Sequence, residues 1–79
     1  MNIDRVRVAF RARPFRPFWI NTASGRSYRV PGPETMAIDP DEEVVILMPG
    51  GGEVAMIDVA GIVEITYNFN AQAIGEDRP

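Results

Sequence analysis

The sequence predicts a mainly β domain, in which five short strands close into a small barrel behind a short N-terminal helix. Three observations predict this fold. Apolar and polar residues alternate in short runs after Pro14, turns rich in glycine and proline separate these runs, and 79 residues suffice for one small domain with a thin core. Short strands with close connections hide their apolar faces most economically as a bent barrel, with the helix packed over one open end.

The predicted domain spans residues 1–67, and residues 68–79 have little to bury and are expected to form a flexible tail. Its first element is a helix over residues 3–12, with Asn2 suited to cap the N-terminus. Three apolar residues share one face of this helix at the spacing i, i+3 and i+7: Ile3, Val6 and Phe10. The same valine and phenylalanine also alternate with arginines, so a strand remains the alternative. Pro14 ends either element, because the residue before a proline disfavours the helical conformation.

Period-two alternation predicts the five strands. The first two form a hairpin with Gly25 in its turn, and the third and fourth are joined by a glycine-rich turn. A single tight turn over residues 59–62 precedes the last strand. Residues 36–38 are at most a short extended piece. The predicted strands are residues 18–22, 28–30, 44–48, 53–58 and 63–67.

The composition excludes most catalytic machinery. The chain has no cysteine and no histidine, and all eight of its basic residues are arginine, so thiolate nucleophiles, the commonest general base and sulfur-ligated metals are absent. The acidic run at residues 39–43 lacks the glycine of a calcium loop at its sixth position, where Val44 stands. The glycines at 50–52 lack the lysine and helix of a phosphate loop. The sequence therefore predicts a non-enzymatic protein without a metal or a cofactor.

Two further features concern location and charge. No apolar run approaches the roughly 20 residues that cross a bilayer, and the N-terminus lacks the pattern of a secretory signal, so we expect a cytoplasmic protein that does not enter a membrane. Residues 1–30 hold seven arginines and one acidic residue, a net charge of +6, whereas residues 31–79 hold one arginine and ten acidic residues, a net charge of −9. We expect arginines of the first half to pair with carboxylates of the same chain or of a neighbouring subunit.

The stretch RPFRPFWINTASGRSYRV, followed by Pro33 and Glu34, resembles a group of small, largely uncharacterised bacterial proteins. These proteins have a short N-terminal helix and a PFxPFxI…GRxYxV…PE pattern. The resemblance covers most of residues 3–65 and implies the same small β fold, without an established activity. A histidine often precedes the Pro-Glu pair in that group, and Gly32 stands in its place here.

A second resemblance concerns the hairpin. Ile20, Thr22 and Gly25 are spaced as in the first strand and glycine turn of Sm-like proteins, and residues 58–65 are similar to their closing strand. This resemblance implies an SH3-like or Sm-like barrel, which is the architecture that the strand order also favours.

The strands 44–48 and 53–58 are apolar on both faces, and one face of each suffices to fill the barrel. We expect the other face to be covered by a second chain, which makes the protein a homo-oligomer or gives it a stable protein partner. The predicted apolar contacts are Val44, Ile46, Met48 and Met56. The predicted charged and aromatic contacts are Arg13, Arg16, Trp19, Arg26, Tyr28 and Arg29.

Two functions are consistent with these residues. The first, which the sequence favours, is a non-enzymatic interaction or assembly module in which the apolar residues make the contact and the arginines provide electrostatic complementarity. The alternative is an Sm-like protein that binds RNA or single-stranded nucleic acid in a ring-shaped oligomer, with nucleobases stacked on Trp19 and Tyr28. The net charge of −3 counts against nucleic acid.

Overall fold

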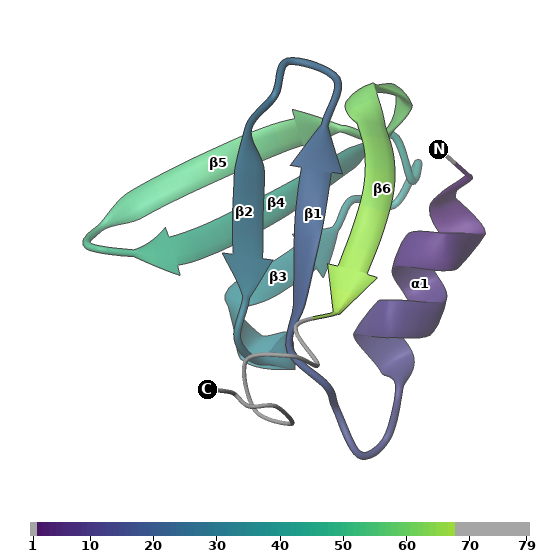
Figure 1. Ribbon diagram of the computed structural model, residues 1–79, viewed down its shortest axis with the longest axis vertical. Coiled ribbons are helices and arrows are strands. Elements are labelled where there is room, and N and C mark those ends of the chain that lie inside the picture. Colours follow the sequence, from purple (N-terminus) through teal and green to yellow (C-terminus); the bar gives the residue numbers. More distant parts are fainter. Residues whose placement is uncertain (1, 68–79) are drawn as a thin grey trace, which may run out of the picture.

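A computed structural model describes residues 2–67 of the chain. The predicted tail, residues 68–79, lies outside the described residues. The helices and strands follow one another in the order shown in Figure 1. They are α1 (Ile3–Arg11), β1 (Phe18–Thr22), β2 (Ser27–Val30), η1 (Pro33–Thr35), β3 (Met36–Ile38), β4 (Val44–Gly50), β5 (Glu53–Asp58), η2 (Val59–Gly61) and β6 (Ile62–Tyr67).

The N-terminal element is the predicted helix and not the alternative strand. The side-chain oxygen of Asn2 accepts a hydrogen bond from the backbone N–H of Asp4 at 2.8 Å, which satisfies one of the free donors of the first turn. Val6 and Ala9 are buried, and Ile3 and Phe10 pack against the core beside them. Because the apolar residues recur at helical spacing, the helix places all four on its inner side.

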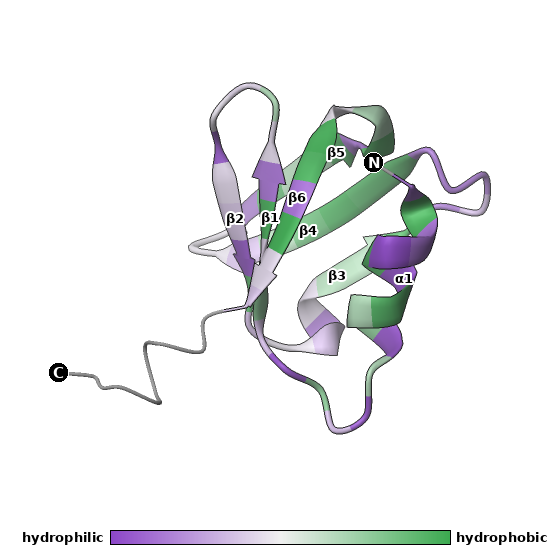
Figure 2. Cartoon of the chain, turned by 45° about the vertical axis from the view of Figure 1, so that its right-hand side comes forward, coloured by the Kyte–Doolittle hydropathy of each residue, from purple (hydrophilic) through white to green (hydrophobic). Residues whose placement is uncertain are grey.

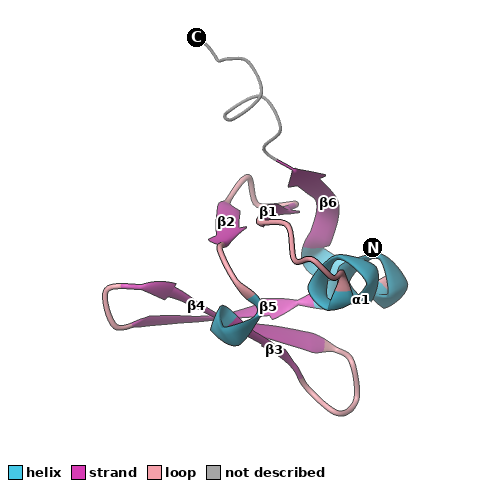
Figure 3. Ribbon diagram, turned by 90° about the horizontal axis from the view of Figure 1, so that it is seen from below, coloured by secondary structure: helices cyan, strands magenta, loops and turns pink. Residues whose placement is uncertain are grey.

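Six strands form two antiparallel sheets, so the prediction of five strands requires correction. The order in the first sheet is β2-β1-β6 and in the second β3-β4-β5. The additional strand is β3, which the sequence marked only as an extended piece and which pairs with β4 over three residues. The chain crosses from one sheet to the other through η1. Figure 3 shows the sheets as separate layers, and no closed barrel is seen in the described part of the chain.

The core lies between the two sheets and under α1 (Figure 2). Each strand contributes the side chains of one face, as period-two alternation requires. In β4 the buried residues are Val45 and Leu47, which alternate with Val44 and Ile46. Phe18 and Ile20 of β1 have no exposed surface, and the half-buried Phe15 packs against Phe18 with 5.8 Å between ring centroids.

The start of β6 differs from the predicted alternation. Val63 was expected on the same face as Ile65, yet its side chain is 57% exposed while that of Ile62 is buried. The cause is a shift in register against β1: Asn21 pairs with Glu64, and the next residue of β1, Thr22, pairs with Ile62. An extra residue in one strand reverses the alternation beyond it. Val63 is that extra residue and faces solvent.

Candidate interaction surfaces

The outer face of the β3-β4-β5 sheet carries a group of apolar side chains exposed to solvent. They lie on the opposite side of β4 and β5 from the buried residues, and Ile46 pairs with Met56 across the two strands. We call this group the outer patch; it consists of Val44, Ile46, Met48, Val54 and Met56. Three of its members have large exposed fractions, 46% for Met48, 60% for Val54 and 72% for Met56.

The four apolar contacts predicted from the sequence all belong to the outer patch. Val44 and Ile46 are half-buried, and the two methionines project further. Val54 is the member that the prediction missed, although it alternates in phase with Met56 and the same pattern identifies it. The tip of the β4–β5 hairpin extends past β2 (Figure 1), so part of this hairpin lies beyond the cover of the first sheet.

The outer patch continues around β5 into a hollow of about 360 Å³ between the two sheets. Met56 and Asp58 line this hollow from β5, and Tyr28 lines it from β2. The guanidinium of Arg26 lies over the ring of Tyr28, 5.3 Å from its centroid. The structure thus brings two predicted contacts, Arg26 and Tyr28, next to the apolar ones.

Trp19 and Arg29 lie elsewhere, on the solvent face of the first sheet. They are directly paired across β1 and β2, and Trp19 also pairs with Thr66 of β6. Asn21, the next residue on this face, accepts a hydrogen bond from the Ser27 hydroxyl at 2.6 Å. Trp19 is half-buried, and the face around it is polar. Because Tyr28 occupies the opposite face of the same sheet, the two aromatic residues do not form one stacking surface.

Arg13 and Arg16 lie in the segment between α1 and β1, away from the outer patch. The Arg13 guanidinium donates hydrogen bonds to the backbone carbonyls of Ala12 at 2.7 Å and Phe10 at 3.3 Å. These are among the carbonyls that a helix leaves without partners at its C-terminal end. Arg16 lies over the ring of Tyr67, 4.5 Å from its centroid. Both arginines therefore have structural contacts within the chain.

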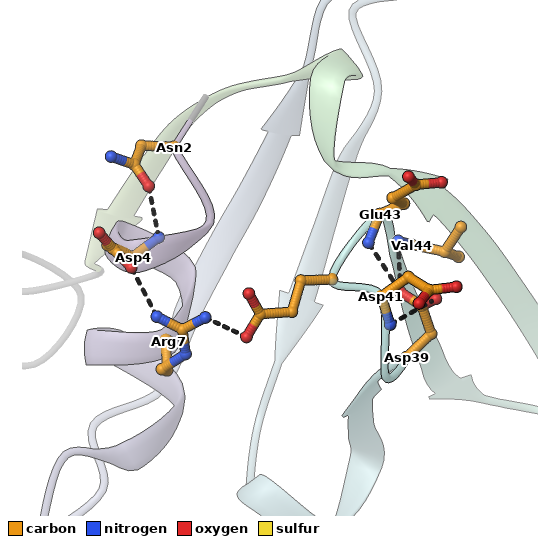
Figure 4. Close-up of polar contacts among 8 residues, drawn as sticks. Asn2, Asp4, Arg7, Asp39, Asp41, Glu43 and Val44 are labelled. Atoms are coloured by element: carbon orange, nitrogen blue, oxygen red, sulfur yellow. Dashed lines mark hydrogen bonds and ion pairs between the residues drawn. The ribbon is translucent and has the colours of Figure 1, made fainter.

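Arg7 shows the expected pairing between the basic and acidic halves of the chain. Its guanidinium donates to the Asp4 carboxylate in the same helix at 2.5 Å and to Glu42 in the turn between β3 and β4 (Figure 4). The hydrogen bond to Glu42, followed by that to Asp4, raises the pKa of Arg7 above its ordinary value. The contact holds α1 to the second sheet, since the turn connects two strands of that sheet.

The predicted acidic turn is organised around Asp39. Its carboxylate accepts hydrogen bonds from the backbone N–H groups of Glu43 and Val44, both at 2.8 Å, and from that of Asp41 at 3.3 Å (Figure 4). These bonds, that from Val44 foremost, lower the pKa of the Asp39 carboxyl. Within residues 2–67 no three acidic side chains gather as metal ligands would. The acidic run is therefore a turn with a structural role. Its first carboxylate accepts hydrogen bonds from three backbone N–H groups that would otherwise bond to water.

In the described part of the chain, no helix has the length and apolar character needed to span a bilayer. Comparison of the chain with protein-family models, with curated proteins and with solved structures gave no match. The proposals below therefore depend on the residues and their geometry.

Proposed function

We propose that the protein is a non-enzymatic interaction module that assembles with a second copy of itself through the outer patch. The observation that supports this proposal is the exposure of Met48, Val54 and Met56 on one face of a single sheet. Isolated apolar residues are ordinary on protein surfaces, whereas a contiguous group of them is typical of a surface that another molecule covers. Because each copy contributes five apolar side chains, a symmetric contact contains ten.

A second copy is the proposed occupant because a sheet face of this kind is self-complementary. In a two-fold symmetric contact the same patch meets itself, so no separate partner surface has to exist. Acidic residues flank the patch at both ends of β5, Glu53 and Asp58, and both are exposed. Arg26 lies over the ring of Tyr28, which lines the same hollow as Asp58. A symmetric contact can therefore pair the carboxylates of one copy with an arginine of the other at its rim.

We further propose that the two sheets are the halves of an SH3-like or Sm-like barrel. The order of the elements supports this reading: a helix, the β1–β2 hairpin, the connection η1 to β3 in the second sheet, the β4–β5 hairpin, and a short 3-10 turn before the last strand. Contacts between β2 and β4 bring the sheets together at one side. The proposal concerns the fold alone and assigns no activity.

The mass of the protein in solution tests self-assembly. Light scattering over a dilution series is expected to give the mass of two or more chains at high concentration, falling toward one chain on dilution. A mass of one chain at every concentration would show that the outer patch does not assemble. Chemical denaturation at two protein concentrations provides a second readout, because the midpoint of an assembled protein rises with concentration.

Binding of single-stranded nucleic acid is the second candidate, and the pairing of Trp19 with Arg29 on an open sheet face favours it. A guanidinium beside an aromatic ring suits a stacked base with its phosphate. Affinity for a random single-stranded RNA should then fall steeply as salt increases. If fluorescence anisotropy detects no binding at about 50 mM salt, where phosphate contacts are strong, this candidate is excluded.

A further inference from the structure

The last strand, β6, has one free edge in the described part of the chain. In the sheet order β2-β1-β6, its only partner among residues 2–67 is β1. The other edge faces α1 (Figure 1), and residues of both elements line the same hollows. A strand edge of this kind presents unpaired N–H and C=O groups in a row, and these pair readily with another extended chain.

Two hollows lie between this strand and the helix. One hollow, of about 350 Å³, lies between Val8 of the helix and Ile65 and Tyr67 of the strand. A second hollow, of about 490 Å³, lies at the other end and is lined by Ile62 and Val63. Arg5 lines both hollows and therefore lies between them; the two hollows with Arg5 are called the α1–β6 groove.

The walls of the α1–β6 groove carry apolar side chains that are exposed to solvent. Val8 is 69% exposed and Val63 is 57% exposed, one on each wall. They are the exposed large apolar residues of the described chain that do not belong to the outer patch. The groove is thus a second apolar surface, built from different elements, with a strand edge along its length.

Arg5 is the one unpaired charge of the groove within residues 2–67. The other charged residue there, Asp4, is engaged by Arg7 at 2.5 Å. Arg5 makes no ion pair and no side-chain hydrogen bond with the described residues. A guanidinium at the centre of an apolar groove favours a ligand that brings a carboxylate to that point.

We propose that the α1–β6 groove binds an extended acidic peptide segment of a partner protein, which adds to the first sheet as a strand beside β6. Backbone hydrogen bonds to the free edge hold the segment, as in other cases of strand addition. Every second side chain of the segment points into the groove: the outer two are apolar and enter the two hollows, and the middle one is a carboxylate that pairs with Arg5. Six residues match the length of β6, which is about 20 Å at roughly 3.3 Å per residue.

The test uses a synthetic peptide of six residues, capped at both ends, with valine at positions 1 and 5, glutamate at position 3 on the same face, and threonine at the other positions. Titration of the isotope-labelled protein, followed by its amide NMR signals, should shift the signals of β6 and α1. It should also slow hydrogen exchange of the β6 amides that point away from β1, which pairing with the peptide protects. Arg5→Glu should weaken binding at least tenfold, and a peptide with lysine in place of glutamate should regain affinity for that variant.

Met56→Gln is the matched control, because it alters the outer patch and leaves the groove intact. This variant should bind the peptide as the unaltered protein does. Circular dichroism establishes that both variants are folded. Equal affinity of the peptide for the unaltered protein and for Arg5→Glu would overturn the proposal, as would shifts confined to the outer patch. If the β6 amides that point away from β1 are already protected in the free protein and lose protection on dilution, a second copy occupies the groove and the proposal is wrong.

Discussion

Replacement of Met56 by glutamine tests the outer patch where it projects furthest. Full burial of a methionine side chain contributes about 1.5–3 kcal/mol, and Met56 is 72% exposed in the single chain, so covering it contributes about 1–2 kcal/mol per copy. A symmetric contact contains the residue twice. Met56→Gln keeps the length of the side chain but removes this gain, so assembly should weaken by about 2–4 kcal/mol, roughly a 30- to 700-fold rise in dissociation constant.

Sedimentation equilibrium measures this constant for the unaltered protein and for two variants. The matched control is Val63→Thr, which also makes an exposed apolar residue polar, but on β6 and outside the outer patch. Met56→Gln should shift the equilibrium toward single chains, and Val63→Thr should leave it unchanged. Because Met56 is exposed in the single chain, its replacement should alter folding stability by less than about 0.5 kcal/mol. Equal dissociation constants for all three proteins would refute the role of the outer patch.

Three further predictions concern the fold. Leu47 is fully buried, so Leu47→Ala should lower the free energy of unfolding by about 2–5 kcal/mol in urea denaturation, whereas Val8→Ala, at an exposed site, should change it by less than about 0.5 kcal/mol. Gly25 has a φ of +91°, so Gly25→Ala should lower the free energy of unfolding by roughly 1–2 kcal/mol. Gly61→Ala is the control, because its φ is not positive and no atom lies within 4 Å of an added Cβ. An equal loss of stability in both variants would contradict this reason. The lowered pKa of Asp39 means that its contribution is complete above the unfolded-state pKa of about 3.9 and is lost as pH falls through the folded-state pKa. Asp39→Asn should therefore flatten the decline of the melting temperature in acid, and an unchanged slope would show that other carboxylates cause it.

The sequence predicted the helix, both hairpins and the apolar face of the helix, because local periodicity determines these features. Asn2 caps the helix as its residue type suggests, and Gly25 occupies the turn where only a flexible residue fits comfortably. The alternation of Val54 with Ala55 and of Met56 with Ile57 also identified the two faces of β5 before any coordinates. The local sequence pattern was sufficient to predict a feature wherever that feature depends on a single helix, strand or turn.

Contacts between distant segments were not predictable in the same way. The register shift that turns Val63 outward arises from the pairing of β6 with β1, which no local pattern encodes. The three amides bound by Asp39 depend on the path of the turn, and the sequence showed only an acidic run. The α1–β6 groove was missed for the same reason, since Arg5 and Val63 become neighbours only when the helix lies along the last strand.

The pairing of β1 with β6 determines when, during synthesis of the chain, the first sheet can be completed. Asn21 and Glu64 face one another across the first sheet although they are 43 residues apart in the chain. During synthesis, the β1–β2 hairpin emerges early but lacks its second neighbour until the ribosome has released β6. Contacts between such distant residues also form slowly. We therefore expect the helix and the first hairpin to stay accessible to proteases and chaperones until translation of the domain is nearly complete.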